Sequence, residues 1–450
     1  MAHQNNQTQA LVQEIQSALE ANDLLRVREF MERLHPAEVA DLFESLLPEV
    51  REELWVHIPQ DAEGDVLSHS HAGVRTSLLE HMAPSEVAAA TESLDTDDAA
   101  DILQDLPEPV ADEVLRSMGE QNRRRIAEVL TYPEDTAGGL MNVDAVTVRS
   151  DVDIDGVLHY LRLLPELPDN TDRLMIVDRK NTYLGALPLA DLVTADPDSA
   201  VSELMLTDDD VIPADRSAND VAKLFEKHDL ISAPVVDENG RLLGRITVDD
   251  VVDVILGESE RSIMSAAGLD EEDDIFGPIW STARRRTLWL AVNLVTAFLA
   301  AWVIGLFEAT IEQLVALAVL MPVVASMGGI AGTQTLTIVI RGLALGHVGT
   351  ANARALVSRE LAVGFLNGIL WAVVIAVVAA AWFGNLRLGA VIGFAIVFNL
   401  LTAALAGTAI PLALKRMDID PALAGGVVLT TITDVVGFFT FLGLASFYLV

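Results

Sequence analysis

The sequence predicts a multidomain membrane protein: an all-α helical-repeat domain, an α/β pair of repeated domains, a connector helix and an all-α bundle of five membrane spans. Three observations predict this order. Two similar helix starts, at Pro36 and Pro84, precede residue 131. A strand–turn–strand–helix pattern at 174–193 recurs in the same register at 233–252. Five long apolar stretches then follow residue 284.

Charge is distributed unevenly along the 450 residues. From residue 284 onward nine Lys and Arg stand against six Asp and Glu, so the formal net charge of −37 comes from the part of the chain before that point. An acidic surface repels nucleic acid and anionic lipid and attracts cations. We therefore expect no nucleic-acid partner. Solubility or salt adaptation is the alternative explanation for many of these acids.

Two further features of composition bear on location. Cysteine is absent, which excludes disulfides and thiolate metal sites and suits a reducing cytoplasm. The opening segment, MAHQNNQTQA, lacks a basic stretch followed by an apolar core, so no cleaved signal peptide is expected. Membrane insertion is then expected to depend on the apolar stretches farther along the chain.

Residues 1–131 are predicted to form a helical superhelix. Pro36-Ala-Glu-Val-Ala and Pro84-Ser-Glu-Val-Ala each begin an amphipathic helix, and two helical hairpins fit in the interval between them. Stacked hairpins would build the superhelix, and an ordinary helical bundle is the alternative. His69 and His71 have no third ligand near them in the sequence, so we interpret them as part of an interhelix connection.

Residues 132–200 and 201–256 are predicted to be two copies of one domain. The segment LMIVDRKNTYLGALPLADLV (174–193) matches APVVDENGRLLGRITVDDVV (233–252), and the landmarks keep one register throughout. Each copy has the pattern of a strand, a Gly-containing turn, a second strand and a helix that opens with an acid. This arrangement resembles a CBS domain, and two such domains form a CBS pair.

The CBS resemblance implies that an adenine nucleotide such as ATP binds in the cleft of the pair. In such domains a Thr/Ser-x-x-Asp at the last strand-to-helix junction contacts the ribose. Thr247 and Asp250 match this motif, whereas the first copy has Pro188 where the hydroxyl residue would stand. At most one complete nucleotide site is therefore expected, and a purely structural pair is the alternative.

Residues 257–283 are predicted to be a connector helix, because they are too polar to cross a membrane. Residues 284–450 are predicted to form a membrane domain. Its five apolar stretches each reach the length of about 20 residues that a spanning helix needs. The stretches are 288–307, 311–345, 357–383, 388–414 and 421–449.

Basic residues gather on one side of the predicted spans. Eight of them flank the spans on the side of the N-terminal domains, and only Arg387 lies on the other side. The positive-inside rule then predicts a multi-pass protein of the cell (inner) membrane, with cytoplasmic N-terminal domains and the C-terminus outside. The eight residues are Arg284, Arg285, Arg286, Arg341, Arg354, Arg359, Lys415 and Arg416.

The stretch 321–342 is unusually rich in helix-breaking residues. It contains Pro322, Gly328, Gly329 and Gly332. Such residues permit a break whose freed carbonyl groups face protein or water, and we expect a break here. Close helix packing at Gly328 and Gly332, which form a small-xxx-small pair, is the alternative.

Asp434 is an acid near the middle of the last apolar stretch. An ionised Asp at the centre of a spanning helix costs about 2.5–3.5 kcal/mol even on the gentler insertion scale. At helical spacing it shares a stripe with Gly426, Thr430 and Gly437, and such a stripe is not expected to face lipid. We predict that the acid lines a cation pathway. A structural Asp bonded to Thr or Gln of 321–337 is the alternative.

Enzymatic chemistry finds little support. The chain has no phosphate loop of the form GxxxxGK[ST] and no HExxH zinc motif. An intramembrane aspartyl protease would need two acids within the bundle, and we identify only one there. We expect a protein that is not an enzyme.

At this point the order of domains and several motifs resemble the MgtE-type magnesium transporters over essentially the whole chain. The resemblance implies a homodimeric Mg²⁺ channel whose pore runs between the subunits, with Asp434 facing its symmetry mate and backbone carbonyls near Thr430 and Gly329 as further oxygen ligands. The motifs are Tyr132-Pro-Glu-Asp-Thr-Ala-Gly, Met321-Pro through Gly328-Gly329 to Gly332 and Gln334, Arg341, and Asp420-Pro421-Ala-Leu followed by Asp434 and Gly437.

The resemblance also implies regulation by the transported ion. Uptake would be driven by the membrane potential, and cytoplasmic Mg²⁺ bound between acidic domains would close the channel. A membrane-anchored CBS sensor of nucleotide or Mg²⁺ without transport, or a transporter of other divalent cations such as Co²⁺, is the alternative. The acids at matching positions are Asp97, Asp101, Asp229, Asp250, Asp253, Glu258 and Asp420.

The chain departs from the MgtE pattern at several positions. Ile330 and Thr333 stand where many members carry Asn, and Gly426 stands where they have the Asn of an Asn-Pro pair. Losing amide ligands bears on the choice among divalent cations. Arg261 replaces an acid of the connector helix, which is expected to change the gate.

Overall fold

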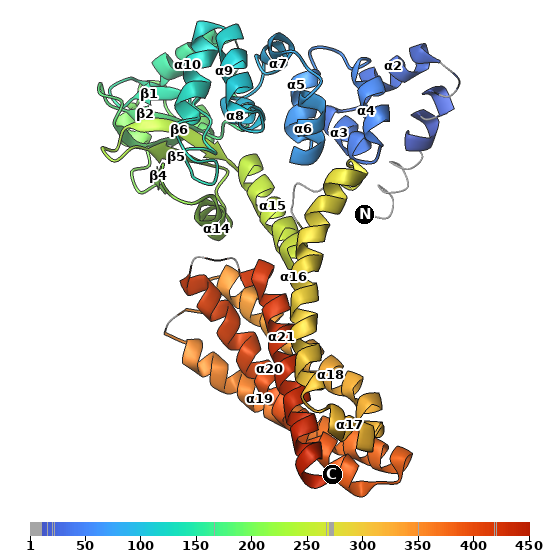
Figure 1. Cartoon of the computed structure of the whole chain (residues 1–450). Coiled ribbons are helices and arrows are strands. Elements are labelled where there is room, and N and C mark those ends of the chain that lie inside the picture. Colours follow the sequence, from blue (N-terminus) through green and yellow to red (C-terminus); the bar gives the residue numbers. More distant parts are fainter. Residues whose placement is uncertain are drawn as a thin grey trace. The chain divides into compact units, whose positions relative to one another are not determined.

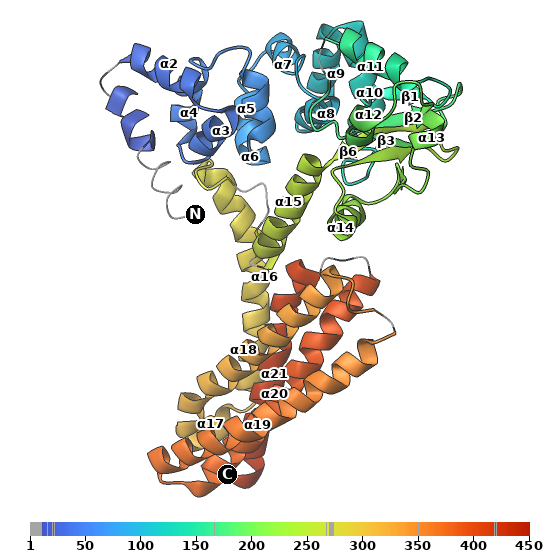
Figure 2. The same cartoon turned by 180° about the vertical axis from the view of Figure 1, so that it is seen from behind.

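The computed structural model describes residues 11–15, 17–19, 21, 23–165, 167–266, 268–269, 274–349, 351–417, 419 and 421–450. The chain divides into two compact units. Unit 1 comprises Met1–Ser259 and Glu272–Pro278, and unit 2 comprises Glu260–Glu271 and Ile279–Val450. Figures 1 and 2 show the elements of each unit from opposite sides.

Short helices form the first half of unit 1 (Figure 1). The two helices predicted to begin with proline do so, and in each a glutamate accepts from a backbone N–H just before the helix: Glu38 Oε2 from His35 at 3.0 Å and Glu86 Oε2 from Ala83 at 2.8 Å. The helices are α2 (Leu24–Arg33), α3 (Pro36–Glu44), α4 (Pro48–Trp55), α5 (Glu63–His69), α6 (Ala72–Leu79), α7 (Pro84–Ala90), α8 (Thr96–Gln104), α9 (Glu108–Ser117) and α10 (Glu120–Val129).

The predicted internal repeat forms two sheets of three strands. In both, the first strand pairs parallel with the second and the second antiparallel with the third. The irregularity in the second pairing falls after Ile176 in one copy and after Val235 in the other, which are equivalent positions of the repeat. The elements are β1 (Thr147–Arg149), α11 (Ile154–Leu163), β2 (Arg173–Val177), β3 (Tyr183–Pro188), α12 (Leu189–Thr194), α13 (Val201–Leu204), β4 (Ile212–Pro213), α14 (Ala218–His228), β5 (Ser232–Val236) and β6 (Leu242–Thr247).

Glycine is required at the same place in both copies. A Cβ on Gly185 would lie 2.2 Å from the carbonyl oxygen of Leu206, and one on Gly244 would lie 2.5 Å from that of Asn142. In both places a neighbouring backbone pairs with the strand next to the glycine. The repeated Leu-Gly therefore lets a further segment approach the sheet edge.

The two sheets pack into different apolar cores. The side chains of β4–β6 belong to one continuous apolar core with helices α2–α10, whereas the first copy has its own core around Ile154, Ile176 and Leu187. Ala99 and Ala100 of α8 and Val251 all lie in the continuous core. This packing brings α8 to the start of helix α15 (Val248–Ala266).

Within the described residues, unit 2 has five helices that are long and apolar enough to span a membrane, as predicted. Helices α18, α19, α20 and α21 pack side by side, and α20 is the most deeply covered of the five (Figures 1 and 2). The helices are α16 (Ile279–Gly305), the short α17 (Glu308–Gln313), α18 (Ala316–Ala344), α19 (Ala353–Phe383), α20 (Leu386–Arg416) and α21 (Pro421–Tyr448). Helix α15 runs through residue 257, so the predicted start of the connector falls inside a helix.

The break predicted within 321–342 is wrong. Helix α18 runs continuously through Pro322 and the three glycines. Instead the glycines admit neighbouring helices: a Cβ on Gly328 would lie 2.3 Å from Nδ2 of Asn399, and one on Gly332 would lie 2.9 Å from a methyl of Leu429. Close packing, the alternative, accounts for these glycines because it needs no lost backbone hydrogen bonds.

Candidate functional site

Two of the predicted metal-binding acids meet in unit 1. Asp97 lies in the first turn of α8 and Asp250 in the first turn of α15, and their carboxyl groups lie close enough for each to change the pKa of the other. Asp97 is 8% exposed, and its Oδ1 has no hydrogen-bond partner among the described residues. Two carboxyl groups can share such a place only if a proton or a cation joins them.

Burial raises the pKa of both groups, because a carboxylate loses its hydration there. The pKa of Asp97 lies well above its usual range, and the charge of Asp250 adds to the rise. Burial raises the pKa of Asp250 to about 7, although hydrogen bonds from Thr247 oppose the change. Without a bound cation, the pair therefore holds a proton near neutral pH.

Other acids surround this pair. Burial raises the pKa of Asp98 to about 6 and that of Asp101 to about 7; Asp95 adds to the rise at Asp98, and the charge of Arg75 opposes the rise at Asp101. Burial also raises the pKa of Asp253, whereas His69 lowers it. His69 ends α5 and His71 caps α6, so the two histidines flank the connection in which both were predicted to lie. The charge of His69 also opposes the rise in pKa at Asp98.

The remaining predicted acids lie elsewhere. Asp229 is the exposed cap after α14, with a left-handed backbone at φ 52°. Glu258 accepts a hydrogen bond from Asn219 at 3.2 Å. Asp420 lies outside the described residues. Within the part of the chain that the structure describes, no three His, Asp or Glu side chains are arranged to hold a metal.

The predicted nucleotide residues lie together. The backbone N–H and the hydroxyl of Thr247 both donate to Asp250 Oδ2 at 3.0 Å, so this carboxylate caps the start of α15. Thr247 is 6% exposed. Asp250 is thus one carboxylate that both the predicted nucleotide site and the predicted Mg²⁺ site would use.

Asp434 lies in α21 with a half-buried side chain. The described residues offer its carboxylate no hydrogen bond and no ion pair, so the alternative of an Asp bonded to Thr or Gln of 321–337 is not observed. One turn earlier, the exposed Thr430 donates to the backbone carbonyl of Gly426 at 3.1 Å. One turn later, Gly437 packs against Asn399 of α20. The predicted stripe is therefore exposed at Thr430 and buried at Gly437.

Gly329 does not present a free carbonyl in this structure. It lies within the continuous helix α18, and its carbonyl oxygen accepts a hydrogen bond from the Thr333 hydroxyl at 2.9 Å. No atom lies within 4 Å of where its Cβ would stand, so the chain leaves open space beside it.

Two buried polar side chains of the spans were not predicted to matter. Glu360 of α19 is 5% exposed, and Thr335 donates to it at 3.5 Å, so the bundle holds a second acid. Asn399 of α20 is fully buried. Asn399 is a polar residue inside a long apolar stretch, which is the signal that could have identified it. Glu360 follows Ser358 and Arg359 near the start of its stretch, so no such signal marks it.

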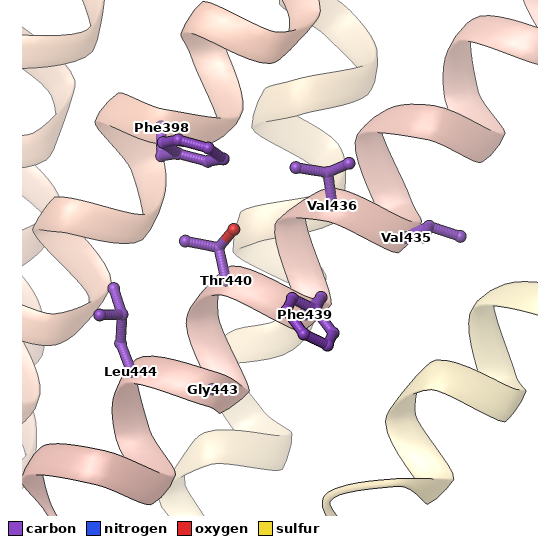
Figure 3. A pocket seen from close by; sticks show the side chains of 7 residues that line it. All are labelled: Phe398, Val435, Val436, Phe439, Thr440, Gly443 and Leu444. Atoms are coloured by element: carbon purple, nitrogen blue, oxygen red, sulfur yellow. The ribbon is translucent and has the colours of Figure 1, made fainter.

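A cavity of about 570 Å³ lies between α20 and α21 (Figure 3). Its lining is apolar apart from the Thr440 hydroxyl, with Phe398 on α20 and Val436 and Phe439 on α21. A hydrated cation needs several oxygen ligands, so this cavity is not suited to holding one.

Three family models match the chain. The model of the MgtE intracellular N domain matches residues 34–135, the CBS domain model matches 201–257, and the MgtE model, described as a divalent cation transporter, matches 321–444.

Similar proteins cover nearly the whole length. The magnesium transporter MgtE of Thermus thermophilus is 32% identical over 97% of this chain and 98% of its own. The magnesium transporter MgtE of Bacillus subtilis is 28% identical over 94% and 95%. A solved structure of the cytosolic domain of the Mg²⁺ channel MgtE in complex with ATP is 32% identical and covers 54% of this chain and 99% of that one, with a TM-score of 0.51.

Proposed function

The chain belongs to the MgtE family of magnesium transporters, and on that premise we propose that it is a homodimeric Mg²⁺ channel gated by cytoplasmic Mg²⁺. It has five candidate membrane spans and a cytosolic N-terminal part. In this proposal the C-terminus lies outside and the pore runs between the subunits. Mg²⁺ is the transported ion.

The observation that carries the proposal is the Asp434 carboxylate. It lies within a spanning helix without a partner among the described residues of its own chain, next to the exposed Thr430 hydroxyl. Such a charge needs a counter-ion or water. In a two-fold symmetric dimer two such carboxylates would meet. Mg²⁺ keeps several of its waters and binds through one or two carboxylates, so this pair would suit it.

The membrane potential supplies the driving force. Moving one charge inward gains about 2.3 kcal/mol per 100 mV, so a divalent cation gains about 4.6 kcal/mol. No nucleotide hydrolysis is needed for uptake. Without control such a pore would leak, and the acidic unit 1 supplies the control in this proposal.

Closure by Mg²⁺ is supported by Asp97 and Asp250. Their carboxyl groups meet at the junction of α8 and α15, and a divalent cation would relieve the repulsion that a proton otherwise relieves. A pair of carboxylates is enough for Mg²⁺, although the described residues hold no three-ligand cluster. Asp101, Asp253, Asp229, Glu258 and Asp420 are proposed as further ligands of the closed state.

We also propose that ATP binds at Thr247 and Asp250, as the ATP complex of the similar cytosolic domain suggests. Because Asp250 is also a proposed Mg²⁺ ligand, nucleotide and gate would be linked. Three departures from the MgtE pattern lie on the proposed conduction helices, at Ile330, Thr333 and Gly426. They would change the preference for Mg²⁺ over Co²⁺.

Mg²⁺ uptake into liposomes that contain the purified protein tests conduction. The wild type should pass Mg²⁺, and Asp434→Ala should abolish the flux while reconstituting equally well. Thr440→Val is the matched control, because it removes a polar group from the apolar cavity of the same helix and should leave uptake unchanged. Liposomes that are tight to Mg²⁺ and Co²⁺ with the wild type would instead favour a sensor without transport.

A further inference from the structure

Asn399 lies where three of the spanning helices meet. It is fully buried in α20, and its Nδ2 donates to the backbone carbonyl of Val324 in α18 at 2.9 Å. A Cβ on Gly328 of α18 would lie 2.3 Å from Nδ2, and a Cβ on Gly437 of α21 would lie 2.7 Å from it. Glycine on both sides therefore lets one amide contact both neighbouring helices.

The remaining atom of this amide is unsatisfied. Asn399 Oδ1 has no hydrogen-bond partner among the described residues, although it is fully buried. An unmet acceptor in such a place destabilises the fold, because it has lost its hydrogen bonds to water, and an apolar side chain of similar size would avoid that penalty. An amide at this position is therefore a poor choice for stability alone.

The two helices that Asn399 contacts are those that carry the proposed conduction residues. Gly329 follows Gly328 directly in α18, and Asp434 stands one turn before Gly437 in α21. Farther along, Gly332 packs against Leu429 and Gly425 packs against Leu336, so α18 and α21 run antiparallel in contact. A shift at Asn399 would move the two helices past each other at the level of Asp434.

We propose that Asn399 is a positioning residue that fixes α21, and with it Asp434, against α18. The polar link to Val324 has a direction, and apolar packing between small residues has none. The hydrogen bond thus fixes the rotation and the height of α20 against α18, and the close approach of Gly437 seats α21 against the amide held there. The functional part of this inference rests on the proposed conduction through Asp434.

The chain has no cysteine, so two introduced cysteines can carry spin labels without background. Ile338 of α18 and Val428 of α21 are exposed and suit labelling. In the full chain, Asn399→Leu should shift or broaden the distance distribution between these labels. Its thermal unfolding temperature in detergent should equal or exceed that of the wild type, because the unsatisfied acceptor is gone.

Mg²⁺ uptake by the Asn399→Leu variant should change as well. The half-saturating Mg²⁺ concentration, or the ratio of Mg²⁺ to Co²⁺ uptake, should change between about two- and thirtyfold, the range that indirect coupling usually spans. Asn399→Ala with Gly437→Ala fills the lost volume without restoring the link, so it should unfold like the wild type but keep the altered uptake.

Three outcomes decide the matter. An unchanged label distance in Asn399→Leu overturns the positioning role, whatever the flux. Full recovery of distance and uptake in the double alanine variant also overturns it, because packing alone would then suffice. A shifted distance in a protein whose wild type passes no ion leaves the positioning role in place and refutes conduction.

Discussion

Buried carboxyl groups join distant segments at two places in unit 1. The two places differ in the kind of group that the carboxyl faces. At one, Asp97 of α8 meets Asp250 of α15, so an acid faces an acid. At the other, Arg51 of α4 meets Asp274, which lies shortly before α16 begins. The first junction needs a proton or a cation to hold, whereas the second carries its own counter-charge.

The Arg51 junction is completely satisfied. Its guanidinium donates to both oxygens of Asp274 at 2.6 and 3.0 Å, and its Nε donates to the Phe43 carbonyl at 2.6 Å. Burial alone would raise the pKa of Asp274, but the hydrogen bonds from Arg51 and from the Phe276 N–H lower it. The lowered pKa keeps this carboxylate charged to a lower pH than an unpaired Asp, so this junction is permanent near neutral pH where the Asp97 junction is conditional.

The largest expected effect tests the permanent junction. Arg51→Ala should lower the free energy of unfolding by about 3–5 kcal/mol, because it leaves Asp274 without its counter-charge and Phe43 without a donor. Denaturant unfolding of the full chain in detergent measures this. Arg28→Ala, which breaks the exposed pair with Glu32, is the control and should cost about 0.5 kcal/mol or less. Equal losses in both variants would remove the distinction between the two junctions.

The next effect tests the conditional junction through pH. With Mg²⁺ removed by a chelator, the stability of unit 1 should fall as pH rises from about 4 to about 7. The pKa of Asp250 is about 7 in the folded chain against 3.8 as the ordinary value, so the folded state binds more protons in this window. The stabilisation is complete below the ordinary value and is lost as pH rises through the raised one.

A pKa difference of one between the folded and unfolded chain is worth about 1.4 kcal/mol, so the loss is on the order of 4 kcal/mol. Asp97→Asn should reduce the slope, because it removes a carboxyl group whose raised pKa also binds a proton in the folded chain. The Arg51 junction should add no slope, because the pKa of Asp274 is lowered and its contribution is complete above the ordinary value. Asp98 and Asp101, whose pKa values are also raised, should leave a residual slope, and a slope equal to that of the wild type would mean that Asp97 does not contribute to it.

The parts of the fold that repeat or run long were predictable from sequence. The helix starts at Pro36 and Pro84, the shared register of the two copies and the five apolar stretches each repeat one local rule, and each element formed as expected. The pairing of Arg51 with Asp274 joins positions 223 residues apart and follows no period. It depends on where two folded segments meet, which no local pattern encodes.

The same limit explains the error in α18. Pro322 and the glycines favour a break when the helix is considered alone, and only the presence of Asn399 and Leu429 beside Gly328 and Gly332 shows that they admit neighbours. Asp97 and Asp250 were each predicted as ligands through a family resemblance. That they share one buried place could be seen only once α8 and α15 were packed.

The smallest expected effect concerns the gate. If Mg²⁺ joins Asp97 to Asp250 in the closed channel, then Asp97→Asn removes one of the two carboxylates from the ion. A loss of about 1 kcal/mol in coupling means that closure needs roughly fivefold more internal Mg²⁺. Mg²⁺ uptake into liposomes loaded with increasing Mg²⁺ measures the shift.

Asp112→Asn is the matched control for the gate, because it removes one negative charge from α9 at an exposed pair with Arg116. The Asp112→Asn channel should close at the same internal Mg²⁺ concentration as the wild type. The general field of an acidic surface is screened by salt, whereas a direct contact between ion and ligand is not. A shift of equal size in both variants would mean that internal Mg²⁺ responds to the net charge of unit 1. The junction of α8 and α15 would then be conditional on protons but not on the transported ion.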